Sequence, residues 1–317
     1  MLLPDLGNSR ILLWSDFYNC LSDSFVAFIR KSFIIEDMIK NRMLSFCVIV
    51  FVYLLAVAGG TFCFDFLSQR NGLSFEIMLL IADVFATAIV FAFSLIFRNA
   101  SVYDPYWSVQ PPVILFGVLL RFGGTSFSWI LFAAILIWGL RLTGNWAYNF
   151  TGFDYQDWRY TMLKEKSGIV YPLINFLGIH LFPTLVVYFC ILPAVEAVRF
   201  GAELRAVCVP FLVLAFMAPI FQGIADLQMH SFRKEGSGGF IRTGLWKHSR
   251  HPNYACEILM WWSVGLACFF AMDLQWQLLL GAAINTLMFL FISIPMADKR
   301  QSRKPGFAEY KKSTRML

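Results

Sequence analysis

Residues 43–64 read MLSFCVIVFVYLLAVAGGTFCF, a stretch without a charged side chain. A helix needs about 20 mostly apolar residues to cross the hydrocarbon core of a bilayer, so this stretch predicts a membrane-spanning helix. The whole chain of 317 residues has a matching composition, with 58% hydrophobic and 15% charged residues. Soluble domains carry roughly a quarter charged residues, and disordered chains are poor in aromatic ones. The sequence therefore predicts an all-α, polytopic integral membrane protein.

Seven further apolar segments bring the expected number of membrane helices to seven or eight. They are residues 77–97, 108–120, 128–148, 171–193, 206–229, 254–272 and 276–296. Segment 108–120 is short, and its two prolines suit a first helical turn. If all eight segments cross, 22 Lys and Arg residues lie on one side and four on the other. The positive-inside rule then favours eight spans with both termini in the cytoplasm.

The N-terminal part differs from the rest. We expect residues 1–42 to be an extension and residues 43–317 to be a single transmembrane domain. Large apolar side chains recur in the extension at helical spacing, which is typical of a helix lying in the membrane interface. They are Phe17, Leu21, Phe25 and Phe28.

The densest polar stretch of the chain reads GLWKHSRHPNY at residues 244–254 and is followed by Glu257. Pro252 suits the first turn of a helix. Four side chains before and at this turn can carry positive charge: Lys247, His248, Arg250 and His251. With the free amides of a helix N-terminus, they form an arrangement that binds phosphate-like anions. Asn253 and Glu257 share a helix face, where they can hydrogen-bond a ribose or a carboxamide.

The preceding membrane segment ends with a second polar face. Asp226, His230 and Arg233 fall on one side of a helix. Anionic lipid headgroups explain the basic residues here, but not the inward-facing acids and amides, so we favour a buried anionic ligand. Two more polar stretches, residues 149–168 and 298–310, are predicted on the same side and can close over the helix mouth. The sequence shows no strand pattern and no GxGxxG motif that follows one, which excludes a Rossmann domain.

Two ionisable residues, Asp83 and His180, stand alone inside apolar segments. A single polar residue inside a helix bundle is more often a satisfied structural group than a functional one. We therefore expect a structural hydrogen bond at each. The cysteines lack the spacing of zinc ligands, and no metal is expected.

Five motifs carry a family resemblance. They are WGLRLTG at 138–144, DWRY at 157–160, GLW at 244–246, SRHPNY at 249–254 and KPGFAEY at 304–310. Together they resemble the DUF1295 group of the steroid 5α-reductase-like membrane family over roughly residues 77–317. The Arg-His-Pro-Asn-Tyr element alone is also similar to one in isoprenylcysteine carboxyl methyltransferases and in sterol C14-type reductases.

The resemblance implies NADPH bound between the later helices and reached from the cytoplasm. By position, it assigns cofactor contacts to Arg141, Gln222, Asp226, Arg233, Asn253 and Glu257, and through the matching motif to His248, Arg250, His251 and Tyr254. It also implies the endoplasmic reticulum membrane for a eukaryotic source and the inner membrane for a bacterial one. We expect a monomer among membrane lipids, with no nucleic-acid partner.

The expected active end departs from the family's pattern. Steroid-converting members have a Gln-Glu pair opening a membrane segment and a Tyr on the next helix. Here residues 104–107 read DPYW, and Trp138 holds the Tyr position. Asp104 can replace the Glu, and Tyr103 or Tyr106 the phenol, so we assign catalysis to Asp104 and Tyr106. Burial raises the pKa of a carboxyl and would keep Asp104 protonated near neutrality, although capping of the next helix explains this residue equally well.

The favoured hypothesis is an NADPH-dependent oxidoreductase that reduces the C=C bond of a conjugated enone in a hydrophobic lipid such as a steroid, sterol or polyprenoid. The alternative is an S-adenosylmethionine-dependent methyltransferase of the isoprenylcysteine type. The motifs at 157–160 and 304–310 favour the reductase, as do the basic residues, because S-adenosylmethionine has no phosphate. A transporter or non-catalytic protein ranks third, since the polar residues do not repeat in two halves.

Overall fold

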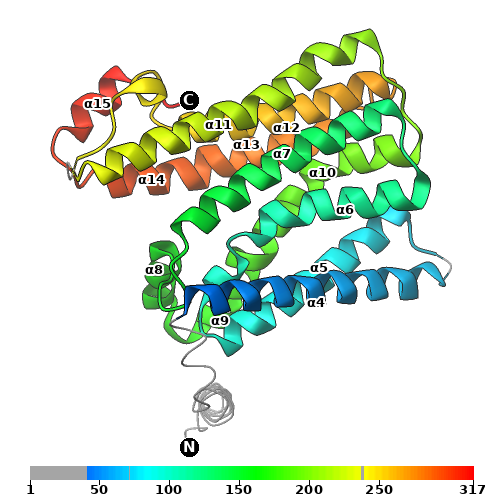
Figure 1. The fold of residues 1–317 in the computed structure, drawn as a ribbon, viewed down its shortest axis with the longest axis horizontal. Helices are drawn as coiled ribbons and strands as arrows, with labels where there is room; N and C mark the ends of the chain where they lie inside the picture. Colours follow the sequence, from blue (N-terminus) through cyan, green and yellow to red (C-terminus); the bar gives the residue numbers. More distant parts are fainter. Residues whose placement is uncertain (1–40, 71, 237–238) are drawn as a thin grey trace, which may run out of the picture. The chain divides into compact units, whose positions relative to one another are not determined.

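A computed structural model describes residues 41–70, 72–236 and 239–317. Within these ranges the chain forms helices and no strand (Figure 1), which confirms the all-α prediction. Seven helical segments of the described chain are long and apolar enough to cross a membrane. The interfacial helix expected around Phe17–Phe28 lies outside the described residues.

The described helices are α4 (Arg42–Ser68), α5 (Phe75–Ile96), η2 (Ala100–Tyr103), α6 (Tyr106–Phe122), α7 (Ser126–Asn149), α8 (Trp158–Ser167), η3 (Gly168–Val170), α9 (Tyr171–Ile174), η4 (Asn175–Leu181), α10 (Phe182–Arg199), η5 (Ala206–Cys208), α11 (Val209–Lys234), η6 (Gly244–Lys247), α12 (Pro252–Ala271), η7 (Trp276–Leu279), α13 (Leu280–Met288), η8 (Phe289–Ser293), α14 (Ile294–Gln301) and α15 (Phe307–Ser313). The π-helical turns η4 and η8 are continuous with their neighbours, so Trp158–Arg199 and Trp276–Gln301 each form one long helical segment.

Helix α6 corresponds to the short predicted span. Its 17 residues give a length of about 26 Å, less than the roughly 30 Å of the hydrocarbon core. The helix begins at Tyr106, so Pro111 and Pro112 lie inside it. The prediction that they occupy its first turn is wrong. A proline cannot donate to the carbonyl four residues earlier, which is Ser108 for Pro112. That carbonyl faces Gly139 of α7, where an added Cβ would lie 2.5 Å from the oxygen, so glycine permits the close approach.

The described residues pack into two compact units. Of the described residues, those up to Tyr106 form unit 1 together with Asn149–Thr184, and those of Trp107–Tyr148 and Leu185–Leu317 form unit 2. In unit 1, α4 packs on α5, and Gly60 allows contact with the backbone of Ala82.

In unit 2, the polar ends of three helices lie together. Arg141 and Asn145 of α7 meet Asp226 and His230 of α11, so these two helices run side by side in the same direction. Helix α12 runs back along α11, because Gln222 lies beside Asn253 at one end and Phe211 stacks on Phe270 at the other. The ends of α7 and α11 and the start of α12 therefore lie together.

Candidate functional site

The predicted helix mouth is present at the start of α12. The helix begins at Pro252, whose missing N–H costs nothing in a first turn. Just before it, the hydroxyl of Ser249 accepts the backbone N–H of His251 at 3.0 Å. Asn253 and Glu257 lie one turn apart on α12. The side-chain amide of Gln222, on α11, donates to the backbone carbonyl of Asn253 and to the carboxylate of Glu257.

The centre of the site is a group of buried side chains that we call the Glu257 cluster. It consists of Trp138, Arg141, Gln222, Asp226, Glu257 and Trp261. The carboxylate of Glu257 is 3% exposed and accepts the indole N–H of Trp138 at 2.9 Å and that of Trp261 at 2.9 Å. The amide of Gln222 donates to the same carboxylate at 2.7 Å. Three neutral donors from three helices thus fix one buried anion.

Arg141 joins a second carboxylate to this cluster. Its Nη1 donates to Asp226 Oδ2 at 2.6 Å, and its Nη2 lies 3.8 Å from Glu257 Oε2. One guanidinium therefore serves two carboxylates, and the cluster carries a net negative charge. Such a group attracts hydroxyl and amide donors more than phosphates.

Some polar atoms of the Glu257 cluster are left unused. Arg141 Nε, Arg141 Nη2 and Gln222 Oε1 are buried and have no hydrogen-bond partner among the described residues. The amide nitrogen of Gln222 is fixed by two acceptors, the Asn253 carbonyl at 3.1 Å and Glu257, so Oε1 faces elsewhere. An unpaired buried donor or acceptor costs about 1–3 kcal/mol. The cluster therefore suits a ligand that offers both an acceptor and a donor, as a carboxamide does.

Arg250 and His251, which the resemblance assigns to the cofactor, meet a different partner. Arg250 Nη2 lies 3.3 Å and His251 Nε2 3.0 Å from the carboxylate of Asp298, which Lys311 also approaches at 3.0 Å. We call these four side chains the Asp298 junction. Burial lowers the pKa of His251, and this outweighs the opposing effect of the Asp298 hydrogen bond. Arg250 also donates to the carbonyls of Lys311 and Thr314.

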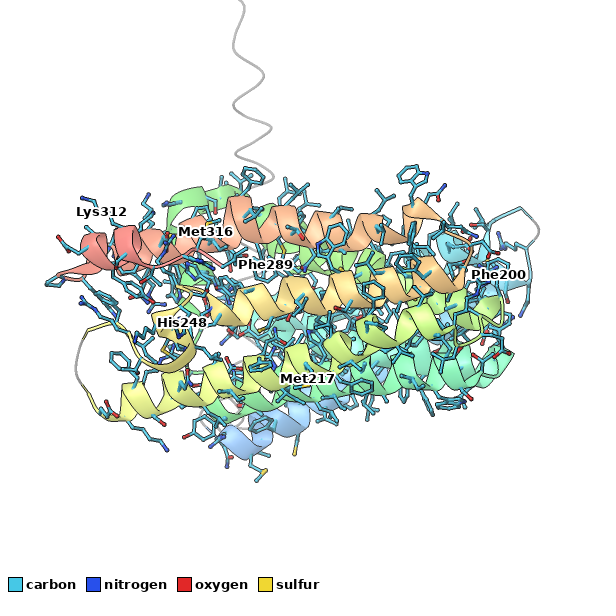
Figure 2. All side chains as sticks on the ribbon, turned by 90° about the horizontal axis from the view of Figure 1, so that it is seen from above. Phe200, Met217, His248, Phe289, Lys312 and Met316 are labelled. Atoms are coloured by element: carbon cyan, nitrogen blue, oxygen red, sulfur yellow. The ribbon has the colours of Figure 1, made fainter. Side chains whose placement is uncertain are left out.

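The C-terminal tail therefore closes over the start of α12, as predicted. Arg250 N–H donates to the carbonyl of Arg315 at 2.9 Å, and Tyr310 O–H donates to the carbonyl of Trp246. The ring of Phe240 packs against those of Phe307 and Tyr310, with centroids 5.3 Å and 5.0 Å away. Figure 2 shows His248, Lys312 and Met316 at this same end of the molecule.

The remaining predicted cofactor residues lie around these two groups. Arg233, in the last turn of α11, and His248 are exposed, whereas Asn253 and Tyr254 are partly buried. The ring of Tyr254 stacks on that of His251 with centroids 5.3 Å apart. Arg233 and His248 thus lie at the surface of unit 2, whereas the Glu257 cluster is buried.

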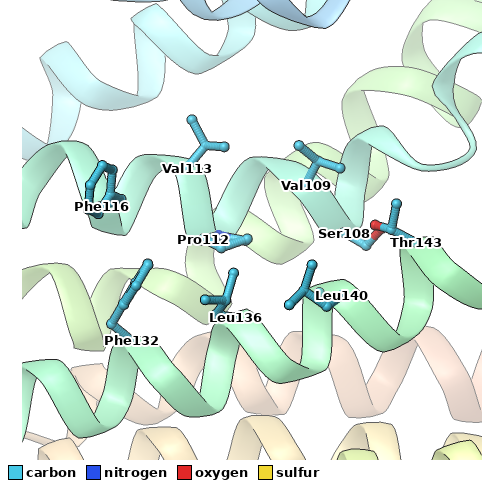
Figure 3. Close-up of a pocket in the computed structure, with 10 residues that line it drawn as sticks. Ser108, Val109, Pro112, Val113, Phe116, Phe132, Leu136, Leu140 and Thr143 are labelled. Atoms are coloured by element: carbon cyan, nitrogen blue, oxygen red, sulfur yellow. The ribbon is translucent and has the colours of Figure 1, made fainter. Parts of the chain in front are cut away.

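An apolar groove of about 310 Å³ lies between α6 and α7 (Figure 3). Leu136, Leu140 and Thr143 of α7 line it. Helical periodicity puts these residues on the opposite face of α7 from Trp138 and Arg141. The groove is therefore separate from the Glu257 cluster.

The two predicted catalytic residues belong to unit 1 and have different partners. Asp104 accepts the hydroxyl of Tyr160, in the DWRY motif, at 2.5 Å, and it also bonds Ser101. These two hydrogen bonds go to side chains of unit 1. Burial raises the pKa of Asp104 to about 6, against the lowering effects of Tyr160 and Arg159. The direction agrees with the prediction, but the value leaves only roughly a tenth of the carboxyl protonated at pH 7.

Tyr106 is buried, and its ring lies 5.4 Å from that of Tyr53 and 5.6 Å from that of Tyr103. Its hydroxyl is hydrogen-bonded to Thr87, on α5. Tyr106 is thus part of a hydroxyl network, whereas Asp104 is held by the DWRY motif.

Comparison with known proteins agrees with the motifs. A family model described as "Protein of unknown function (DUF1295)" matches residues 90–314. The chain belongs to the DUF1295 family. It is 26% identical over 198 residues to an uncharacterized protein of Schizosaccharomyces pombe, an alignment that covers 52% of this chain and 56% of that protein. The chain thus spans little more than half the length of this curated relative. No solved structure matches it.

The DUF1295 match includes every candidate site residue, from Asp104 to Glu257, whereas α4 precedes it. Sequence reasoning missed Trp261 and gave Asp298 no role of its own. The first had a signal, because Trp261 follows Glu257 by one helical turn. The second had none, since nothing local shows that Asp298 meets Arg250.

Proposed function

We propose that this DUF1295 protein is a membrane-embedded reductase that uses NADPH to reduce the C=C bond of a conjugated enone in a hydrophobic lipid. The observation that carries the proposal is the Glu257 cluster, a buried polar group with unused donors and an unused acceptor. Burying polar groups in apolar surroundings costs free energy. Polar groups that a membrane protein keeps there are therefore candidates for a functional site.

The residues of unit 2 suit the two chemical parts of NADPH. Arg141 Nη2 and Gln222 Oε1 complement the carbonyl and amino groups of the nicotinamide carboxamide, and Glu257 and Asp226 can accept ribose hydroxyls. The exposed Arg233 and His248 would hold the phosphates at the surface of unit 2. When bound, NADPH supplies the hydride, and the protein orients it and excludes water.

Asp104 would supply the acid that the reduction needs. A protonated carboxyl can donate its proton to the oxygen of the developing enolate, and Tyr160 holds that carboxyl in place. Replacing Asp104 by Asn is expected to lower turnover by about 10²–10⁴-fold and to leave NADPH binding intact. Because the pKa of Asp104 is about 6, turnover should fall as the pH rises above that value. Loss of NADPH binding in Asp104→Asn would refute this role.

One observation favours the second candidate. Two carboxylates facing one guanidinium also suit the cationic sulfonium of S-adenosylmethionine. The exposed basic residues around the start of α12 favour the phosphates of NADPH. The two cofactors therefore separate the two proposals.

The deciding experiment is the thermal stability of the purified full chain in detergent, with NADPH or with S-adenosylmethionine. A ligand that binds only the folded state adds about 2.7 kcal/mol at a hundredfold excess over its dissociation constant. We expect NADPH to stabilise the wild type but neither Arg233→Ala nor Glu257→Gln. Arg205→Ala is the matched control, because Arg205 precedes α11 at its other end and bonds the exposed Asp273. Stabilisation by S-adenosylmethionine alone would establish the methyltransferase, and stabilisation by neither would overturn both.

A further inference from the structure

Unit 1 contains a group of buried polar side chains that the reductase proposal does not use. His180 lies in the π-helical turn η4 and is 0% exposed, and Asn175 at the start of that turn is 3% exposed. The sequence predicted a lone His180 with a structural hydrogen bond. The structure has that hydrogen bond, between Nδ1 and the carbonyl of Asn175, and it also places the imidazole beside Tyr103 of η2. π-Helical turns inside longer helices occur frequently at functional sites.

The hydroxyl groups beside His180 satisfy one another. Tyr103 and Thr184 are hydrogen-bonded at 2.8 Å, and Thr184 and Thr87 at 3.2 Å. Tyr106 is hydrogen-bonded to Thr87 as well. These hydroxyls are therefore committed within the network.

The imidazole of His180 has one nitrogen left over. Nδ1 lies 3.0 Å from the carbonyl oxygen of Asn175, and a carbonyl can only accept, so Nδ1 carries the hydrogen. A fully buried imidazole favours its neutral form, because charge is costly to bury. Nε2 is then a bare acceptor, and it has no hydrogen-bond partner among the described residues. The side-chain oxygen of Asn175 is a second buried acceptor without one.

Aromatic rings surround this acceptor. The ring of His180 lies 4.7 Å from that of Tyr103 and 5.3 Å from that of Phe91, and Phe91 packs on Phe176 at 4.9 Å. Both α5 and η4 belong to segments apolar enough to lie in a bilayer. The partner that Nε2 lacks is thus a hydrogen-bond donor among apolar, aromatic side chains.

We propose that the Asn175–His180 turn binds the hydroxyl group of a lipid alcohol, which donates its hydrogen to His180 Nε2. A hydroxyl is the smallest group that supplies the missing donor, and the aromatic rings suit the hydrocarbon next to it. A carboxylate or phosphate headgroup does not fit, because a neutral imidazole has no hydrogen on Nε2 to donate to it. The site uses Asn175 and His180, to which the reductase proposal gives no role.

The test uses the full chain in phosphatidylcholine nanodiscs without NADPH, with farnesol and farnesyl methyl ether as probes. The two probes share their hydrocarbon, but only farnesol has a hydroxyl donor. We expect farnesol to bind the wild type about tenfold more tightly than the ether. Equal affinities would overturn the proposal, as would an absence of binding, since a water molecule would then be the partner of Nε2. This comparison needs no variant.

Two variants locate the effect. His180→Phe should lose the tenfold preference and bind both probes alike, whereas Thr184→Val, which breaks the neighbouring hydroxyl network, should keep the preference. A photoreactive farnesol analogue should label the peptide that contains residues 175–184. Labelling elsewhere, or an unchanged preference in folded His180→Phe, would refute the site. Glu257→Gln should bind farnesol as the wild type does, which distinguishes this site from the proposed reductase pocket.

Discussion

The Glu257 cluster and the Asp298 junction are both buried carboxylate groups of unit 2, but their partners differ. Glu257 is fixed by neutral N–H donors, and its nearest cation, Arg141, is 3.8 Å away and bonded to Asp226. Asp298 is surrounded by three basic side chains, among them Arg250, which is also bonded to tail carbonyls.

The two halves of the SRHPNY motif therefore have different structural roles. The first half of SRHPNY, through Arg250 and His251, fastens the C-terminal tail. The second half and the helix that follows, through Asn253 and Glu257, form the wall of a polar cluster with unused hydrogen-bonding atoms. We infer that a change in the junction acts mainly on stability and a change in the cluster mainly on ligand binding.

The largest effect is expected for Asp298→Asn. Removing one partner of a buried ion pair leaves the other charge uncompensated, which costs about 3 kcal/mol. Thermal unfolding in detergent should show a fall of several degrees, with NADPH affinity changed less than threefold. Asp273→Asn is the control, because Asp273 is 85% exposed in its pair with Arg205 and exposed pairs contribute about 0–1 kcal/mol. A large loss of NADPH affinity in Asp298→Asn would join the two regions into one site.

Arg141→Gln should act in the opposite way. Losing the guanidinium removes a charged donor from the proposed carboxamide site, so the dissociation constant for NADPH should rise about 30-fold. Fluorescence titration measures it, with Arg250→Gln as the matched arginine, for which less than a threefold change is expected. Equal effects of the two substitutions would contradict the division of tasks.

Trp261→Phe tests the neutral donors of Glu257. The ring stays, but the N–H that donates at 2.9 Å is lost, and NADPH affinity should fall about tenfold. The neighbouring Trp262 provides the control, because its N–H donates to the hydroxyl of Thr286 instead. If Trp262→Phe weakened NADPH binding as much, the effect would come from helix packing and not from the Glu257 cluster.

The smallest effect concerns pH and the junction. The pKa of His251 in the folded chain is below its usual value of about 6.5, so the unfolded chain takes up the proton first as the pH falls. Stability should therefore decrease below pH 6.5, with a contribution under about 1 kcal/mol. The measurement is the unfolding temperature between pH 7.5 and 5.5 for the wild type and His251→Gln. An identical slope in both proteins would show that His251 does not titrate on unfolding.

Much of the fold could be predicted because it depends on composition and local signals. Apolar stretches such as residues 43–64 must form helices in a membrane, since every backbone polar group needs an internal partner there. Pro252 likewise marks the start of α12, because its ring fits only the first turn without loss of a hydrogen bond. The length of α6 was harder, since hydropathy does not show that the helix begins at Tyr106 with both prolines inside it.

The sequence by itself determined which residues are polar within apolar surroundings, and so which belong to a candidate site. Only the tertiary structure decided their partners. Arg250 lies just before α12 and Glu257 in its second turn, yet one meets Asp298 and the other meets Trp138 and Gln222. These partners are 48, 119 and 35 residues away along the chain. Such contacts arise when helices pack, and no local pattern of residues specifies which side chains then meet.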